Sequence, residues 1–296
     1  MDSLDHSNPS STLKQIDIKH ELEEKGYCVV PNILSSTEIE TALNYFHTWL
    51  DTNPDMKEKH KKVPHGIFRF HQAGHQRHAW YIRTRENVQN VFKTLWNTDE
   101  LVVSYDGCCW LSKDINKKDN IWTHTDQSPS NTEFVCYQSF VALTTNITRS
   151  LVVYEGSHKL YKKYAEEKGL NHKINWQLID YDYLESIKHL KRIIYAPAGS
   201  LVIWDSRTFH QNQYGNPEER IVQYVSYLPK KGRSQKMYEK RLKYLHELRT
   251  TSHWAYPVKV NGLQPQTFKN KDLLIDYSLL QPPDLEDLMT EIMKLV

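Results

Sequence analysis

The sequence has no apolar run close to the roughly 18 residues that a membrane helix needs, so we expect no membrane span. Its first residues, MDSLDHSNPSSTLKQ, are polar and lack the apolar segment of a secretory signal peptide. The formal net charge of +2 provides no overall attraction to nucleic acid or to an anionic membrane surface. These absences predict an intracellular, cytoplasmic protein.

Cysteine is also scarce, and no pair has the CxxC spacing of a redox or zinc site. Since nothing indicates secretion, we expect all of them to be free thiols in a reducing compartment. They are Cys28, Cys108, Cys109 and Cys136. The chain of 296 residues is long enough for one large domain with a sizeable core.

The N-terminal part of the chain reads as mainly helical. Residues 1–12 are rich in Ser, Asp, Asn and Pro and predict a disordered lead-in before a domain over 13–229. Helices are expected over 13–25, ending at Gly26, over about 36–50 with Ser35 or Ser36 as N-cap, and over 85–97. A short strand is expected over 27–30.

Residues 54–78 are basic and rich in histidine, with few periodic apolar residues, so we expect a loop there. Solvated or pocket-rim histidines are the favoured interpretation, and a metal-binding cluster is the alternative. The histidines are His60, His65, His71, His75 and His78.

Short segments rich in Val, Ile, Tyr and Trp dominate from about 100 to 228, interrupted by a helical insert at roughly 158–190. Such strand density predicts a mainly β fold with flanking helices, of the jelly-roll or cupin-like kind.

Residues 230–296 predict a basic, mostly helical C-terminal extension that docks on the same domain and closes with an amphipathic helix over 282–296. The stretch 230–249 carries the densest positive charge. We interpret it as a solvated helix face. The alternative is a docking patch for nucleic acid or another acidic partner.

Two distant segments carry residues suited to one metal. His124 and Asp126 form an HxD pair, whose side chains project to the same side of an extended strand. His210 follows a turn and strand, GSLVIWD, that a jelly roll can place beside the first segment. Two histidines and one carboxylate, with three coordination positions left open, are the ligand set of non-haem Fe(II) oxygenases. These three residues are the predicted catalytic and metal-binding residues.

Arg220 stands at the head of the apolar segment RIVQYVSYL. A charge at such a place is costly unless it is paired, and a guanidinium fork matches a carboxylate in bidentate fashion. A keto acid that chelates the metal would present its distal carboxylate to such a residue. The alternative is an ion pair with Glu218, Glu219 or another surface acid.

The ordered motifs resemble the phytanoyl-CoA dioxygenase-like branch of the Fe(II)/2-oxoglutarate oxygenases. The resemblance covers about residues 20–228 and includes EKGYCVVP at 24–31 and VVYEGSHK at 152–159. It implies a double-stranded β-helix, with Fe(II) bound by His124, Asp126 and His210, and 2-oxoglutarate paired with Arg220. O2 is then the co-substrate and ascorbate a suitable reductant. Asp126 stands where halogenases of this family carry a small residue, which favours hydroxylation.

Further residues are assigned by position. Gln138 contacts the keto acid or a metal-bound water, or makes a structural hydrogen bond. Tyr224 and Ser226 share strand parity with Arg220 and are expected to face inward and help bind the cofactor. Trp122 lines the pocket or fills the core, and Asp106 orients the substrate or serves as a turn carboxylate.

The sequence therefore predicts a 2-oxoglutarate-dependent dioxygenase that hydroxylates a C–H bond of a small molecule, releasing succinate and CO2. One alternative is an oxygenase acting on a protein or nucleic acid through the basic segment. The other is a jelly-roll binding protein without catalysis, against which the three metal-binding residues and Arg220 argue.

Overall fold

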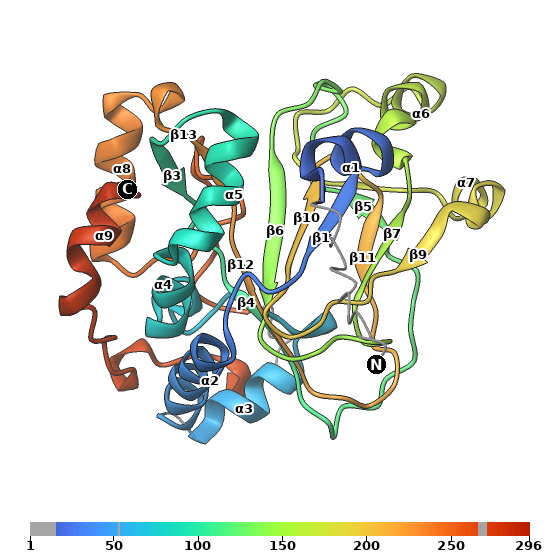
Figure 1. The fold of residues 1–296 in the computed structure, drawn as a ribbon. Helices are drawn as coiled ribbons and strands as arrows, with labels where there is room; N and C mark the ends of the chain where they lie inside the picture. The colour runs from blue at the N-terminus through green and yellow to red at the C-terminus, as the bar shows by residue number, and fades with distance from the viewer. Residues whose placement is uncertain (1–15, 53, 266–270) are drawn as a thin grey trace, which may run out of the picture.

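The computed structural model describes residues 16–52, 54–265 and 271–296. Two antiparallel sheets face each other and build a double-stranded β-helix, with helices packed around it (Figure 1). The predicted fold class, mainly β with flanking helices, is confirmed. The proposed lead-in over 1–12 lies outside the described residues. No helix in the described ranges is both long enough and apolar enough to cross a membrane.

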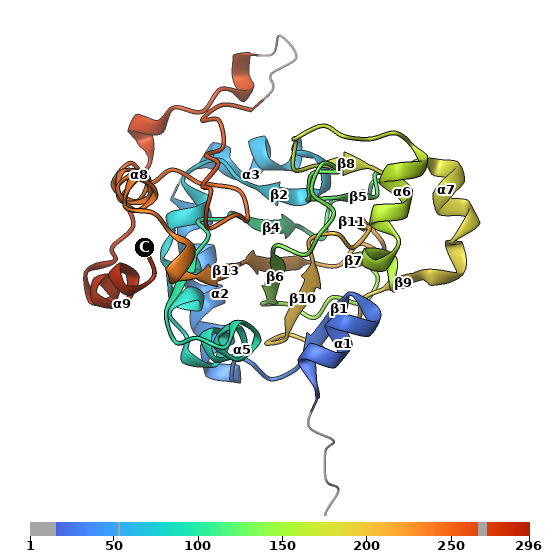
Figure 2. The same cartoon turned by 90° about the horizontal axis from the view of Figure 1, so that it is seen from above.

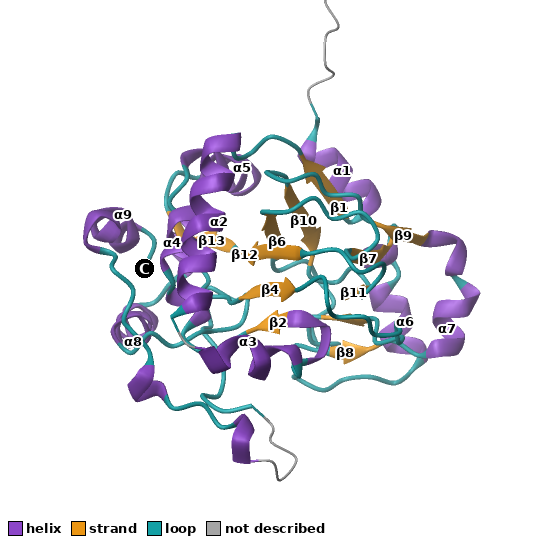
Figure 3. Cartoon of the chain, turned by 90° about the horizontal axis from the view of Figure 1, so that it is seen from below, coloured by secondary structure: helices purple, strands orange, loops and turns teal. Residues whose placement is uncertain are grey.

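The larger sheet has the strand order β1-β10-β6-β12-β4-β2, and several of its strands can be followed side by side in Figure 3. The smaller sheet has the order β8-β5-β11-β7-β9, and β3 pairs with β13 beside them. In the larger sheet the strands are β1 (Tyr27–Val30), β10 (Leu201–Asp205), β6 (Tyr137–Ala142), β12 (Arg220–Tyr224), β4 (Cys108–Leu111) and β2 (Ile67–Phe68). The others are β8 (Gln177–Leu178), β5 (His124–Thr125), β11 (His210–Asn212), β7 (Leu151–Tyr154), β9 (Lys191–Ile193), β3 (Leu101–Val103) and β13 (Tyr227–Pro229).

The larger sheet is buried on both faces, which explains why its strands are mainly apolar. In β6, Phe140 and Ala142 pack between the two sheets, whereas Val141 packs against the helices. In β10, Val202 and Ile203 divide in the same way. Successive side chains of a strand point to opposite faces, so one run of sequence contributes to both hydrophobic cores.

Helices cover the outer face of the larger sheet (Figures 1 and 2). They are α1 (Ile18–Lys25), α2 (Ser36–Asp51), α3 (Pro54–Lys61), α4 (Arg77–Arg83) and α5 (Glu86–Trp96). Ser35 and Glu38 form a reciprocal capping box at the start of α2. Gly26 ends α1 with φ of +79°, and a Cβ there would clash with the His158 ring.

The expectation for 54–78 is wrong: this segment forms α3, β2, the start of α4 and short turns. The histidines at 60, 71, 75 and 78 are buried. His60 stacks on Phe68 with ring centroids 3.8 Å apart, and His78 packs between Phe46 and Trp49. Aromatic partners from distant elements, which no local pattern reveals, make these imidazoles part of the core.

The insert at 158–190 contains α6 (Tyr161–Glu167), β8 and α7 (Tyr181–Ser186), so a strand stands in a stretch expected to be helical. Tyr161, Tyr164 and Leu184 form a separate apolar cluster with Phe209 on the outer side of the smaller sheet. The strand β8 pairs with β5 and thereby supports the segment that carries His124.

The C-terminal extension contains α8 (Gln235–His246) and α9 (Met289–Lys294). Between them the described backbone is mostly irregular with short 3₁₀ turns, so the extension is less helical than the charge and apolar patterns indicate. Residues 282–285 are not helical. Leu245, Ile292 and Val296 join the core beneath the N-terminal helices.

Arg241 stabilises this extension through buried hydrogen bonds. It is buried and donates to the backbone carbonyls of Ala255 at 2.7 Å, Val103 at 2.6 Å and Leu295 at 3.1 Å. Arg233 likewise donates to the carbonyl of Val296. Part of the charge in 230–249 therefore serves internal hydrogen bonds rather than a surface.

We expect Arg241→Met to lower the free energy of unfolding by roughly 3 kcal/mol or more, because three buried carbonyls lose a charged donor. Urea titration measures the change. Lys240→Met is the matched control, since Lys240 is exposed on the same helix. Equal stabilities of the two variants would contradict a structural role for Arg241.

Candidate metal centre

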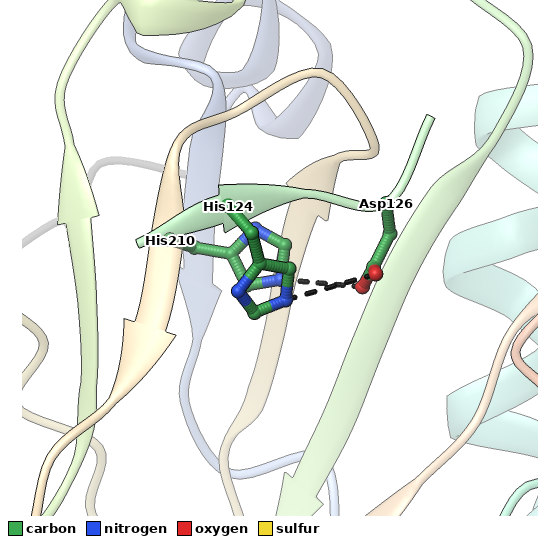
Figure 4. Close-up of side chains that lie close together, drawn as sticks. All are labelled: His124, Asp126 and His210. Atoms are coloured by element: carbon green, nitrogen blue, oxygen red, sulfur yellow. Dashed lines mark ion pairs between the residues drawn. The ribbon is translucent and has the colours of Figure 1, made fainter. Parts of the chain in front are cut away.

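His124, Asp126 and His210 lie together at one end of the barrel, and their ligand atoms are all within 4.8 Å of one another (Figure 4). The Nε2 atom of His124 is 3.6 Å from Oδ1 of Asp126, and Nε2 of His210 is 3.4 Å from Oδ2. Within the described ranges, this is the one group of three such residues with the spacing of a metal site.

Strand pairing explains how distant residues meet. The strands β5 and β11 are antiparallel neighbours, and His210 stands directly opposite His124 in their register. Asp126 follows β5 by one residue, and its N–H donates to the carbonyl of Ser206 at 3.2 Å. The turn before β11 thus holds the segment that carries the carboxylate.

Both imidazoles have one nitrogen fixed by the backbone. Nδ1 of His124 lies 3.0 Å from the carbonyl of Trp122, and Nδ1 of His210 lies 2.8 Å from that of Thr208. A carbonyl only accepts, so each Nδ1 carries a hydrogen, and Nε2 is the nitrogen that faces Asp126. This arrangement orients both rings with Nε2 available to a metal.

The electrostatics suit a cation. Burial by itself raises the pKa of Asp126, but His124 and His210 beside it hold that pKa well below its ordinary value. Burial, together with the neighbouring His124, lowers the pKa of His210. The centre therefore combines an ionised carboxylate with a neutral His210 at pH 7, which is the protonation state that metal binding requires.

Gln138 holds the carboxylate in place. Its Nε2 donates to Oδ2 of Asp126 at 2.8 Å, and its Oε1 accepts from Nε1 of Trp204 at 3.1 Å. Two roles were considered for Gln138, namely contact with the keto acid or a metal-bound water, and a structural hydrogen bond. The structure contains a hydrogen bond of the second kind, to the carboxylate of Asp126.

We expect Gln138→Leu to weaken metal affinity about tenfold, because outer partners of metal ligands are worth roughly 10- to 100-fold. Competition with a chromophoric chelator measures the affinity. Gln235→Leu, an exposed change on α8, serves as the matched control. Unaltered affinity in Gln138→Leu would show that Asp126 orients itself without this hydrogen bond.

A cavity of about 230 Å³ opens beside the three residues. Trp122, Gln138, Tyr224 and Asp106 line it. The ring of Trp122 stacks on His124 with centroids 4.7 Å apart. Ser226 is absent from the lining residues, because β12 ends at Tyr224 and the alternation that placed Ser226 inward stops there.

Arg220 lies fully buried at the start of β12 and is absent from the residues that line the cavity. Its Nε donates to Asn146 at 2.8 Å, and its Nη2 finds no hydrogen-bond partner among the described residues. Glu218 instead accepts from the backbone N–H groups of residues 147–149, and Glu219 accepts from Trp110.

Several cavity residues escaped the sequence analysis. Asn212 on β11 donates to the hydroxyl of Tyr224 at 3.0 Å. Its position two residues after His210, on the same face of β11, was the available signal. The others come from the residue after β2 and from the C-terminal extension, where no pattern pointed to a site. They are Arg69, Thr251, Ser252, His253 and Asn261.

A double-stranded β-helix in which two neighbouring strands of the smaller sheet bring together two imidazoles and a carboxylate has the architecture and ligand set of the non-haem iron oxygenases. A family model described as phytanoyl-CoA dioxygenase matches residues 22–213, which is more than half of the chain. The chain belongs to this family.

Individual relatives are more distant. "Ava biosynthesis cluster protein O" of Aspergillus versicolor is 27% identical over 199 residues, which are 60% of this chain and 62% of that protein's length. EctD of S. alaskensis, solved with 2-oxoglutarate and 5-hydroxyectoine, has a TM-score of 0.52 at 14% identity, covering 78% of this chain and 82% of EctD. HygX of Streptomyces hygroscopicus, solved with nickel and 2-oxoglutarate, has a TM-score of 0.51 at 13% identity, covering 73% and 87%. The solved structures share the fold.

Proposed function

We propose that this protein is an Fe(II)- and 2-oxoglutarate-dependent dioxygenase that hydroxylates a C–H bond of a small molecule. The observation that carries the proposal is the convergence of His124, Asp126 and His210 within 4.8 Å beside a cavity in a double-stranded β-helix. Membership of the phytanoyl-CoA dioxygenase family supports the same reaction class.

The donor set fits iron. Each imidazole is oriented by a backbone acceptor at Nδ1, with Nε2 available to a metal, and Asp126 is oriented by Gln138. Two nitrogens and one oxygen leave open positions for a chelating co-substrate and for O2. When bound, iron with 2-oxoglutarate and O2 supplies the oxidising chemistry and releases succinate and CO2.

The side of the cavity formed by β12 fits 2-oxoglutarate. Tyr224 lines the cavity and is hydrogen-bonded to Asn212, while Arg220, at the start of the same strand, lies beyond the lining residues with an unpartnered Nη2. Arg220 is fully buried and has no carboxylate partner within 4.0 Å in the described part of the chain. A dicarboxylate whose distal end reaches Arg220 would give this charge the partner that its burial demands.

The remaining side chains restrict access to the metal. Trp122 and Trp204 border the cavity on two sides, and Trp176 stacks over His124 with ring centroids 5.7 Å apart. Such aromatic walls exclude water from the reaction and hold an apolar part of the substrate next to the metal. The size of the cavity, about 230 Å³, favours a small molecule over a macromolecule.

The alternative, a macromolecular substrate bound through 230–249, rested on the positive charge of this segment. Part of that charge is used within the protein. Arg233, Arg241 and Arg249 in this segment donate to carbonyl groups of the chain itself. The exposed lysines that remain lie mainly on α8 and make a solvated helix face.

A succinate-release screen tests the proposed function. The protein is incubated with Fe(II), 2-oxoglutarate, ascorbate and candidate small molecules, and succinate is measured with and without a chelator. We expect metal-dependent release that at least one compound stimulates. The absence of 2-oxoglutarate binding and of any succinate release would overturn the proposal.

A further inference from the structure

A segment far from the metal-binding residues in sequence lines one side of the cavity. The part of the cavity between this segment and Asp106 is here called the outer cavity. Residues 250–261 form a small hairpin, here called the C-terminal hairpin, in which Thr251 pairs with Val260 as an antiparallel bridge. The N–H of Ser252 donates to the carbonyl of Lys259 at 2.9 Å, and that of Asn261 donates to the carbonyl of Thr250 at 2.9 Å. After α8 the chain folds back towards β2 and β4 (Figure 2).

The hairpin is held on the barrel by hydrogen bonds. The N–H of Thr251 donates to the carbonyl of Tyr105 at 2.9 Å, and the N–H of Tyr105 donates to the Thr251 hydroxyl at 3.1 Å. The N–H of Gly74 donates to the hydroxyl of Thr250 at 3.0 Å. Backbone hydrogen bonds to two separate segments hold the hairpin in one position, which is what a preorganised binding wall requires.

Thr251, Ser252, His253 and Asn261 line the same cavity as the metal-binding residues. They lie beyond residues 22–213, the part that matches the family model. This wall is therefore contributed by the extension of the chain and not by the matched domain.

Three polar side chains along the outer cavity have atoms without a hydrogen-bond partner among the residues described. They are Oδ1 of Asp106, Oγ of Ser252 and Nε2 of His253. Such buried atoms are costly to leave unpaired, so their gathering around one cavity indicates a site for a polar ligand group.

Asp106 sets the chemistry of that group. It is buried, and burial raises the pKa of its carboxyl to about 7. No Lys or Arg side chain lies within 4.0 Å of its carboxylate in the described ranges. Arg83 donates to the backbone carbonyl of Asp106, and its charge opposes the rise in the pKa without pairing with the carboxylate. A buried carboxylate is stabilised most by a cation that donates hydrogen bonds.

We propose that the outer cavity is a substrate subsite in which Asp106 binds an amino group of the substrate and the C-terminal hairpin closes over it. The inference rests on the proposed function and adds a class of substrate, a small amine whose apolar part lies against Trp122 next to the metal. Ser252 and His253 provide hydrogen-bonding groups at the wall that faces this amine.

Three probes of equal chain length test the charge preference: n-pentylamine, 1-pentanol and pentanoate. Each is titrated calorimetrically into wild-type protein loaded with Ni(II) and 2-oxoglutarate. We expect n-pentylamine to bind at least tenfold more tightly than the other two. Equal affinities, or a preference for pentanoate or pentanol, would overturn the proposal without any variant being needed.

Asp106→Asn should abolish the preference for n-pentylamine while changing 2-oxoglutarate affinity less than twofold. Asp99→Asn is the matched control, because it makes the same chemical change at a residue whose side chain is 95% exposed. A preference that persists in Asp106→Asn would also overturn the assignment of Asp106.

The hairpin is tested by removing its unpartnered hydroxyl. We expect Ser252→Ala to weaken n-pentylamine binding at least threefold, because the amine loses a hydrogen-bonding group at this wall. Ser186→Ala, the same change at an exposed serine, is the matched control and should leave the affinity unchanged. Equal affinities of wild type and Ser252→Ala for n-pentylamine would remove the hairpin from the subsite.

Failure of the proposed function remains distinguishable from failure of the subsite. Ni(II) and 2-oxoglutarate binding are measured first on the same wild-type sample. If they do not bind, the proposed function fails, and the three probes are compared on the metal-free protein, where the preference for n-pentylamine still decides the subsite.

Discussion

We expect His210→Ala to abolish turnover and to weaken metal binding by at least about a hundredfold, beyond the effect of losing an outer partner. The ring of His210 presents Nε2 3.4 Å from Asp126, and its loss leaves only one imidazole and one carboxylate at the centre. Two protein ligands do not complete the facial set that this class of metal site uses. Chelator competition and succinate release measure the two effects.

His124→Ala and Asp126→Ala should have the same effect, since each removes one member of the set. The fold should persist, because β5 and β11 pair through their backbones. The matched control is His189→Ala at an exposed position, which should retain both activity and metal affinity. Full activity in any two of the three variants would refute the assignment of the metal centre.

Arg220→Ala should weaken 2-oxoglutarate binding by at least about a hundredfold. Its Nε is occupied by Asn146, its Nη2 has no partner, and its Nη1 makes only a 3.6 Å contact with Sγ of Cys109, which a distal carboxylate can replace. Hydrogen bonds between charged groups contribute about 1.5–3 kcal/mol each, and each 1.4 kcal/mol corresponds to about tenfold in affinity. Titration of 2-oxoglutarate into Ni(II)-loaded protein measures the loss.

Arg220→Lys keeps the charge without the fork and should recover only part of the affinity. Arg207→Ala is the comparison variant, because Arg207 is engaged with Asp205 at 2.7 Å and should not affect 2-oxoglutarate. Arg149 is likewise occupied, donating to the carbonyls of Ser112, Tyr214 and Glu218. Unchanged affinity in Arg220→Ala would mean that the distal carboxylate is bound elsewhere.

Much of the fold and the core of the candidate site could be predicted from local pattern. Apolar runs in 100–228 predicted the strands, because both faces of the larger sheet are buried and most positions are apolar. Ser35 with Glu38, and Gly26 with positive φ, marked helix ends through interactions within a few residues. The spacing of His124 and Asp126 was also a local signal, since it placed two ligands on one side of the chain.

Other assignments depended on where a strand ends or on what packs against it. The alternation of side chains along a strand placed Ser226 on the same face as Tyr224. Because β12 ends at Tyr224, this alternation does not extend to Ser226. The histidines of 54–78 looked exposed because no local apolar pattern surrounds them, whereas Phe68 and Trp110 stack on His60 from separate elements.

The sequence by itself determined the class of fold and the set of residues able to bind a metal, because both follow from periodicity and from short motifs. Only the tertiary structure decided what completes the cavity. Asp106 and the C-terminal hairpin are brought together by hydrogen bonds between Tyr105 and Thr251, which are 146 positions apart in the chain. Contacts of that separation depend on how the whole chain packs, and no pattern within a single segment records them.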